Sequence, residues 1–158
     1  GLIPPALEKE YVAWMKRSNG PAAAAMIETG VSAGTDVTGF GLLGHLWEMC
    51  AGSGLGAVLD MGSIPAMARI EEMVNSGMVP AGAYRNRDHL QNRVTAGSLP
   101  EGRLWPLFDP QTSGGLLIAV PPEKADSLEI ALGARDVPVH RIGLFRKEPG
   151  IEIKNRDP

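Results

Sequence analysis

The chain has 158 residues, of which 44% are hydrophobic and 21% are charged, and its net charge at pH 7 is −3. This length and composition are typical of one globular domain that buries roughly two-thirds of the surface of its unfolded chain. The lysines and arginines are scattered and aromatic residues make up only 5%, which argues against a nucleic-acid partner.

The first 61 residues contain signals for five elements. Apolar residues recur at helical spacing in the first helix, and an alanine-rich helix follows it. Pro21 suits the first turn of the second helix, and Gly30 suits its end. The predicted order is helix, helix, strand, helix and strand, over residues 5–17, 22–29, 31–37, 42–51 and 55–61.

The second part of the sequence is less regular. Ser63 suits the cap of a helix over residues 64–75. Residues 79–97 are polar and irregular, which predicts a long loop with room for one helical turn. A strand, a helix and a last strand are predicted over residues 116–120, 125–132 and 137–145. Strands that alternate with helices predict a sheet covered by helices.

Cysteine usage and hydropathy narrow the class of protein further. Cys50 is the only cysteine, which excludes an intramolecular disulfide and a cysteine zinc cluster, and its place in a helix predicts a packed core thiol. No apolar run approaches the roughly 20 residues needed to span a bilayer. We see no basic region followed by an apolar stretch at the N-terminus, so we expect no signal peptide, no membrane partner and a cytoplasmic location.

The most informative segment is residues 35–45, TDVTGFGLLGH. It places one carboxylate, Asp36, and two hydroxyls, Thr35 and Thr38, on a glycine-rich turn that opens into an apolar helix. Glycine lets the backbone approach a ligand closely, and a helix start offers unpaired N–H groups. One acid beside such a turn suits a metal ion that bridges to phosphate.

Three interpretations of this turn are open from the residues alone. Residues 39–44 fit the G-x-G-x-x-G pattern of dinucleotide folds, with Asp60 near the place of a ribose-binding acid. Against this, Asp36 would repel a pyrophosphate, and two helices precede the motif. In a purely structural interpretation Thr38 caps the helix and Asp36 is a solvated turn residue. In the third, Asp36 binds Mg²⁺, and the other ligands come from elsewhere because one carboxylate is too few.

The segment 35–45 resembles the first signature of the selenophosphate synthetase (selenide, water dikinase) family. DPQTSGGLL at residues 109–117 is similar to the second signature, and VPAG at residues 79–82 followed by Arg85 and Asn86 fits the spacing between them. Ile142 and Gly143 resemble the closing strand of the same domain. The resemblance covers nearly the whole chain but only the C-terminal half of the usual family length. Aminoimidazole ribonucleotide synthetase and its relatives share the architecture but not both motifs.

This resemblance implies an α+β fold with a mixed β-sheet flanked by helices. Residues 1–158 would form one domain, the C-terminal half of a two-domain ATP-dependent synthetase whose N-terminal catalytic half is absent. The family makes selenophosphate from selenide, ATP and water, releases AMP and phosphate, and forms homodimers mainly through the other half. Its nucleophile, catalytic lysine and most metal-binding acids lie there, so we expect no catalytic residue here and no activity from this chain alone.

For the site residues, the resemblance implies that Asp36 helps to hold Mg²⁺ on the phosphates of ATP. Thr35, Thr38 and Gly39 would be cofactor-binding residues that shape the turn near those phosphates. For residues 109–115 we expect packing beside the first signature, with ligand contact as the alternative.

Other candidate residues favour structural roles. His45 and Glu48 have a spacing that can hold a metal, but only two ligands are visible. His89 is expected to be exposed, His140 to point outward from a strand, and the arginines in residues 85–93 to be solvated rather than bound to phosphate. Two further functions stay open: a stand-alone binding module, and a related ATP-dependent enzyme with another phosphoryl acceptor.

Overall fold

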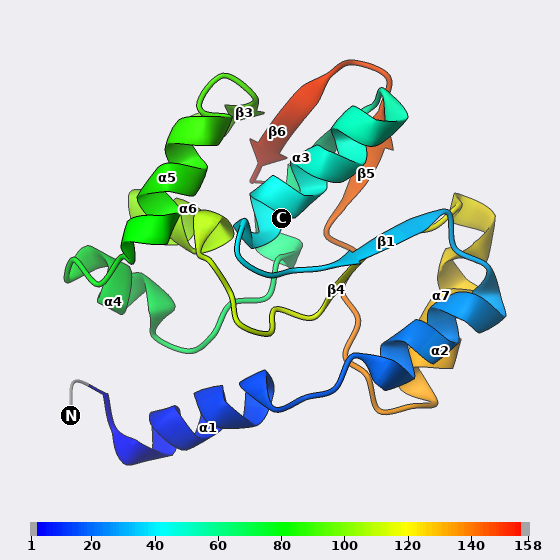
Figure 1. The fold of residues 1–158 in the computed structure, drawn as a ribbon, viewed down its shortest axis with the longest axis horizontal. Helices are drawn as coiled ribbons and strands as arrows, with labels where there is room; N and C mark the ends of the chain where they lie inside the picture. The colour runs from blue at the N-terminus through cyan, green and yellow to red at the C-terminus, as the bar shows by residue number, and fades with distance from the viewer. Residues whose placement is uncertain (1–2, 156–158) are drawn as a thin grey trace.

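The computed structural model describes residues 3–155 (Figure 1). The helices are α1 to α7, at Pro5–Met15, Gly20–Thr29, Gly41–Ser53, Ile70–Asn75, Ala81–Leu90, Glu101–Leu104 and Ala125–Gly133. The strands are β1 to β6, at Ala33–Asp36, Gly56–Asp60, Val94–Thr95, Leu116–Ala119, Gly143–Arg146 and Gly150–Lys154. Short 3-10 helices lie at Met61–Ser63, Trp105–Phe108 and Pro122–Lys124. Within the described part, no helix is both long and apolar enough to cross a membrane.

The strands form two separate sheets. Four strands make a mixed sheet in the order β3-β6-β2-β5, in which β2 runs parallel to β6 and antiparallel to β5. Strands β1 and β4 form an antiparallel pair apart from it, with Asp36 opposite Leu116 (Figure 1). The predicted α+β fold with a mixed sheet and flanking helices is therefore confirmed.

Helix α3 forms the centre of the main hydrophobic core. Its apolar side packs against the four-stranded sheet and contributes Leu43, Leu46 and Cys50. Cys50 has no exposed surface, as predicted, and its burial raises the pKa of the thiol. Strands β2 and β6 complete the core with Leu59 and Ile151.

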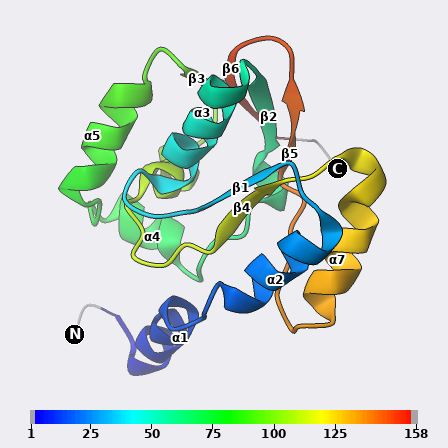
Figure 2. The same ribbon diagram turned by 45° about the vertical axis from the view of Figure 1, so that its right-hand side comes forward.

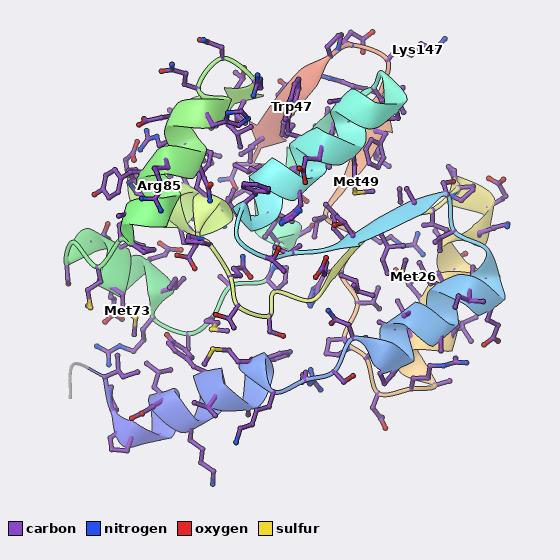
Figure 3. The ribbon with its side chains drawn as sticks, viewed as in Figure 1. Met26, Trp47, Met49, Met73, Arg85 and Lys147 are labelled. Carbon is purple, nitrogen blue, oxygen red and sulfur yellow. The ribbon has the colours of Figure 1, made fainter. Side chains whose placement is uncertain are left out.

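A second, smaller core lies between α2 and α7, which run side by side away from the four-stranded sheet (Figure 2). Ala25 of α2 and Leu128 and Leu132 of α7 are buried there. The α2 helix ends at Gly30 in a left-handed conformation, as expected for its stop. The side chain of Met26 extends from α2 to Gly34 of β1 and connects this core to the β1–β4 pair (Figure 3).

The helix predicted over residues 64–75 is wrong for its first half. Ile64 is extended because it precedes Pro65, and Arg69 has a left-handed backbone, so the helix begins only at Ile70. Ser63 does not cap this helix. Its hydroxyl donates to the Asp60 carboxylate instead, at 2.7 Å.

The loop predicted over residues 79–97 is also wrong, because it contains α5 and β3. Helix α5 buries few apolar side chains, chiefly Ala83 and Leu90, which are seven residues apart and therefore share one face. With so few apolar residues, the sequence of this helix looks like that of a polar loop. Its interaction with the rest of the fold, and not its hydropathy, keeps it helical.

The last predicted strand, over residues 137–145, is correct only at its end. Strand β5 begins at Gly143, and β6 was not predicted. In β6 the buried Ile151 and Ile153 alternate with polar side chains, but five residues give a weak signal. His140 is exposed, as expected, but it does not lie in a strand.

Gly41, at the start of α3, should tolerate alanine less well than Gly54, which follows the end of the same helix. Gly41, the first residue of α3, and Gly54, just after its end, have the same φ of 69°. A Cβ on Gly41 would lie 2.8 Å from the Phe108 carbonyl carbon, whereas no atom lies within 4 Å of one on Gly54. Both substitutions to alanine carry the left-handed backbone cost of about 1–2 kcal/mol. We expect Gly41→Ala to lower the free energy of unfolding, measured with urea, by a further 1–3 kcal/mol or so. Equal losses in the two variants would contradict this packing.

Candidate functional site

The first signature forms the turn between β1 and α3. Asp36 ends β1, Val37 is buried, and the chain then turns through Thr38 and Gly39 to α3. Asp36 and Gly39 are exposed on either side of the buried valine. In the described part of the chain, the Asp36 carboxylate has no hydrogen-bond or ion-pair partner. The buried valine therefore anchors a turn whose acid remains accessible.

Thr38 does not cap α3, so the capping role that the structural interpretation gave this residue is wrong. The N-cap position belongs to Phe40, without a side-chain hydrogen bond, and the Gly41 N–H donates to the Thr38 carbonyl at 3.0 Å. The Thr38 hydroxyl instead lies 3.1 Å from Nε2 of His45, one turn further along α3. His45 is 7% exposed. The Thr38 hydroxyl is therefore held in place by a buried side chain of α3.

The other ring nitrogen of His45 has a looser contact. Nδ1 lies 3.2 Å from Oε2 of Glu48, but the two atoms lack hydrogen-bond geometry. Glu48 itself is exposed. Among residues 3–155, no three His, Cys, Asp or Glu side chains gather into a group able to hold a metal ion. Any metal bound by Asp36 needs ligands beyond those described here.

The second signature runs beside the first. The Val37 N–H donates to the Gly115 carbonyl at 2.9 Å, and the Gly114 N–H donates to the Val37 carbonyl at 3.0 Å. The Gln111 N–H donates to the Thr38 carbonyl at 2.9 Å. A Cβ on Gly114 would lie 2.7 Å from the Val37 oxygen, so this approach requires glycine. The expected packing of residues 109–115 on the first signature is thus observed.

The side chain of Asn86, in α5, connects the first-signature turn to the end of the 3-10 helix that precedes the second signature. Its Nδ2 donates to the Gly39 carbonyl at 3.0 Å and to the Phe108 carbonyl at 2.9 Å. The sequence showed only that Asn86 has a family-like spacing, and no local pattern reveals these contacts. An asparagine in a polar segment has no signal that separates it from a solvated one.

Asp109, at the start of the second signature, is half-buried. Burial raises the pKa of its carboxyl group above the usual range. It borders a cavity of about 30 Å³ lined by apolar residues of α4 and by Trp105 and Pro106. Asp109 is therefore less exposed than Asp36, the acid of the first signature.

The arginines of residues 85–93 differ in their surroundings. Arg85 is exposed on α5 (Figure 3). Arg87 makes two hydrogen bonds to Glu101, at 2.6 and 2.9 Å, which lower the pKa of that carboxyl group, and its guanidinium lies over the Trp105 ring. Arg93 lies over the Trp47 ring and contacts the exposed His89. The expectation of solvated arginines therefore fits Arg85 alone.

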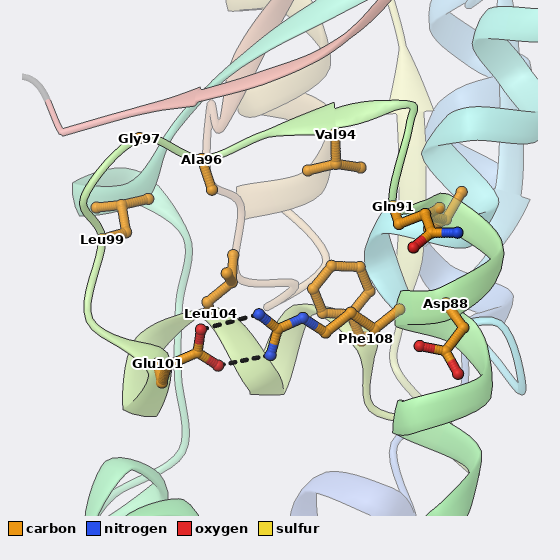
Figure 4. A pocket seen from close by; sticks show the side chains of 11 residues that line it. Asp88, Gln91, Val94, Ala96, Gly97, Leu99, Glu101, Leu104 and Phe108 are labelled. Carbon is orange, nitrogen blue, oxygen red and sulfur yellow. Dashed lines mark hydrogen bonds and ion pairs between the residues drawn. The ribbon is translucent and has the colours of Figure 1, made fainter.

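A crevice of about 420 Å³ lies between α5, β3 and α6 (Figure 4). The paired side chains of Arg87 and Glu101 belong to its lining, and Leu104 and Phe108 line its apolar part. None of the four residues predicted to bind cofactor or metal lines this crevice. The candidate site is thus the exposed turn and not this hollow.

Comparison with known families identifies the domain. The family model described as "AIR synthase related protein, C-terminal domain" matches residues 7–154. The chain belongs to this family. The resemblance found in the two signatures is thereby confirmed at the level of the domain.

Individual members of the family are also similar to this chain. A selenide, water dikinase from Geobacter metallireducens is 49% identical over 126 residues, which cover 80% of this chain and 37% of that protein. One from Trichlorobacter lovleyi is 52% identical over 118 residues, covering 75% and 34%. A solved thiamine-monophosphate kinase from Stenotrophomonas maltophilia is 18% identical with a TM-score of 0.49, covering 79% of this chain and 32% of that one. The chain spans little more than a third of the curated relatives it matches.

The Thr38–His45 hydrogen bond gives a test of how the turn is held. Thr38→Val removes the hydroxyl and leaves the buried Nε2 of His45 without this partner, so we expect the free energy of unfolding to fall by about 1–3 kcal/mol. Thr35→Val is the matched control, because the Thr35 hydroxyl donates only to the exposed carbonyl of Asp36. We expect that control to change stability by less than about 0.5 kcal/mol in the same urea titration. A loss as small in Thr38→Val would show that the hydroxyl does not fix the turn.

Proposed function

We propose that this chain is the C-terminal domain of a two-domain enzyme that makes selenophosphate from selenide, ATP and water and releases AMP and phosphate. Its contribution would be part of a shared Mg²⁺–ATP site at the turn after β1. The observation that carries the proposal is the exposed Asp36 carboxylate, unpartnered within the described residues, on a turn fixed by Val37, Thr38 and Gly39. The similarity to selenide, water dikinases supports the choice of reaction.

The chemistry of the turn fits Mg²⁺ and phosphate. Mg²⁺ is usually bound by one or two carboxylates together with substrate phosphates and water, so one free acid is a sufficient contribution from this domain. The start of α3, a helix of 13 residues, adds the positive end of its dipole beside the turn. When bound, Mg²⁺ neutralises charge on the phosphates. The role of this chain would be to hold Asp36 in place.

Three residues around Asp36 would shape the site rather than react. The Thr38 hydroxyl is engaged by His45, so it supports the turn and leaves the ligand to other groups. Gly39 is exposed, and no atom lies within 4 Å of a Cβ built on it, which leaves its backbone open to a phosphate. The Thr35 hydroxyl donates to the backbone carbonyl of Asp36, the last residue of β1. No group in this chain is proposed to act as nucleophile, acid or base.

Further parts of the proposal concern the intact protein. ATP and selenide would be its substrates, and the remaining Mg²⁺ ligands and the catalytic residues would come from a domain outside this chain. A homodimer and a cytoplasmic location also belong to the proposal. This chain by itself should then turn over neither ATP nor selenide.

The proposal is tested by Asp36→Asn in the full-length enzyme, with phosphorus NMR to detect selenophosphate. The substitution removes a Mg²⁺ ligand but keeps the shape of the side chain, so we expect the Mg²⁺ concentration for half-maximal rate to rise at least about tenfold. Asp88→Asn, at another exposed acid, is the matched control and should leave that concentration unchanged.

Two results would contradict the proposal. A normal Mg²⁺ requirement in Asp36→Asn would remove Asp36 from the metal site. An intact protein that consumes ATP but transfers phosphate to an acceptor other than selenide would favour the related-enzyme alternative, and one that binds no ATP would favour the stand-alone binding module.

A further inference from the structure

We propose that Asn86 is a positioning residue for the Mg²⁺–ATP turn, because its carboxamide holds the Gly39 backbone in place from α5. This inference rests on the proposed function and adds to it a residue outside both signatures. Asn86 would touch neither ATP nor Mg²⁺. It would act through the carbonyl of Gly39, an exposed residue of the turn.

The backbone pairing of the two signatures ends at Thr38, one residue before Gly39. The last hydrogen bond between their backbones runs from Gln111 to the Thr38 carbonyl. The next carbonyl along the chain, that of Gly39, accepts from the Asn86 side chain at 3.0 Å. Asn86 therefore extends the pairing by one residue, to an exposed residue of the turn.

Asn86 is itself held in place by the contacts of α5 on either side of it. Gly82 begins the same face of α5, one turn earlier, and a Cβ there would lie 2.6 Å from Pro110 of the second signature. Leu90, one turn later, is 1% exposed. The helix is thus seated on the second signature at one end and in the core at the other, with Asn86 between these contacts.

The carboxamide of Asn86 suits the two carbonyls chemically. Its NH2 group has two N–H donors, and each meets a backbone carbonyl, those of Gly39 and Phe108. Phe108 is 3% exposed. Aspartate at this position would place an oxygen against both carbonyls, and leucine would leave both without this donor. Asparagine is the residue of this size that satisfies the two carbonyls together.

A link through Gly39 predicts a particular change in kinetics. Loss of the carboxamide frees the Gly39 backbone, while Asp36 stays paired with Leu116 in the β1–β4 ladder. Phosphate binding at the turn should therefore weaken more than the Mg²⁺ requirement changes. A residue that served only stability would lower the melting temperature and leave the affinity of the folded enzyme for Mg²⁺–ATP unchanged.

The test uses Asn86→Leu in the full-length enzyme, which keeps the side-chain size and removes both donors. We expect the Kd for Mg²⁺–ATP, by calorimetry, and its KM to rise about tenfold, with kcat within about threefold. Asn92→Leu is the matched control, at an exposed asparagine just after α5, and should change neither constant. If Asn86→Leu does not fold, Asn86→Ala removes the same donors with a residue of higher helix propensity.

The outcomes separate this inference from the proposed function. A folded Asn86 variant with an unchanged Kd and KM for Mg²⁺–ATP, in an enzyme that makes selenophosphate, overturns the role of Asn86 alone. If the enzyme binds Mg²⁺–ATP but makes no selenophosphate, the proposed reaction fails, and a tenfold rise in Kd still supports Asn86 as the positioning residue. An enzyme that binds no Mg²⁺–ATP overturns both.

Discussion

The pairing of Val37 with Gly114 and Gly115 is the constraint on which the rest of the site depends. It fixes the end of β1 against the start of β4, and it needs glycine at position 114 because a Cβ would collide with the Val37 carbonyl. From this contact follow the burial of Val37, the exposure of Asp36 beside it and the direction in which the chain enters α3. Two segments nearly 80 residues apart thereby become one structural unit.

Groups from three directions then converge on the turn. His45 meets the Thr38 hydroxyl from α3, Gln111 meets the Thr38 carbonyl from the second signature, and Asn86 meets the Gly39 carbonyl from α5. A turn held in this way cannot relax to pair its own acid, which explains how Asp36 stays free. Functional groups fixed by surrounding contacts before a ligand arrives lose less entropy on binding, and the free acid at a rigid turn is what a shared metal site requires.

The sequence predicted the parts of this structure that have strong local signals. The β1–turn–α3 unit, the buried Cys50 and the mixed sheet with flanking helices were all recoverable from apolar spacing, glycines and family-like motifs. Helix α5 was not, because it buries little apolar surface and is held by its contacts with the second signature. The capping role that one of the three interpretations gave Thr38 was wrong, since nothing local shows that a buried histidine lies within reach of its hydroxyl. Asn86 was overlooked for the same reason: its partners lie 47 and 22 residues away.

In the proposed function, the domain would present one acid on a prepared turn, and the remaining ligands would come from a part of the protein outside this chain. The most direct test is paramagnetic relaxation in the isotopically labelled full-length enzyme, with Mn²⁺ in place of Mg²⁺ and with ATP bound. We predict that the amide signals of Val37 and Gly39 broaden strongly while that of Gly133, at the end of α7, does not, and that this chain alone shows no such broadening at equal Mn²⁺–ATP. Unbroadened signals at the turn in the full-length enzyme, or equal broadening in the isolated chain, would contradict a metal–ATP site shared between this domain and the rest of the protein.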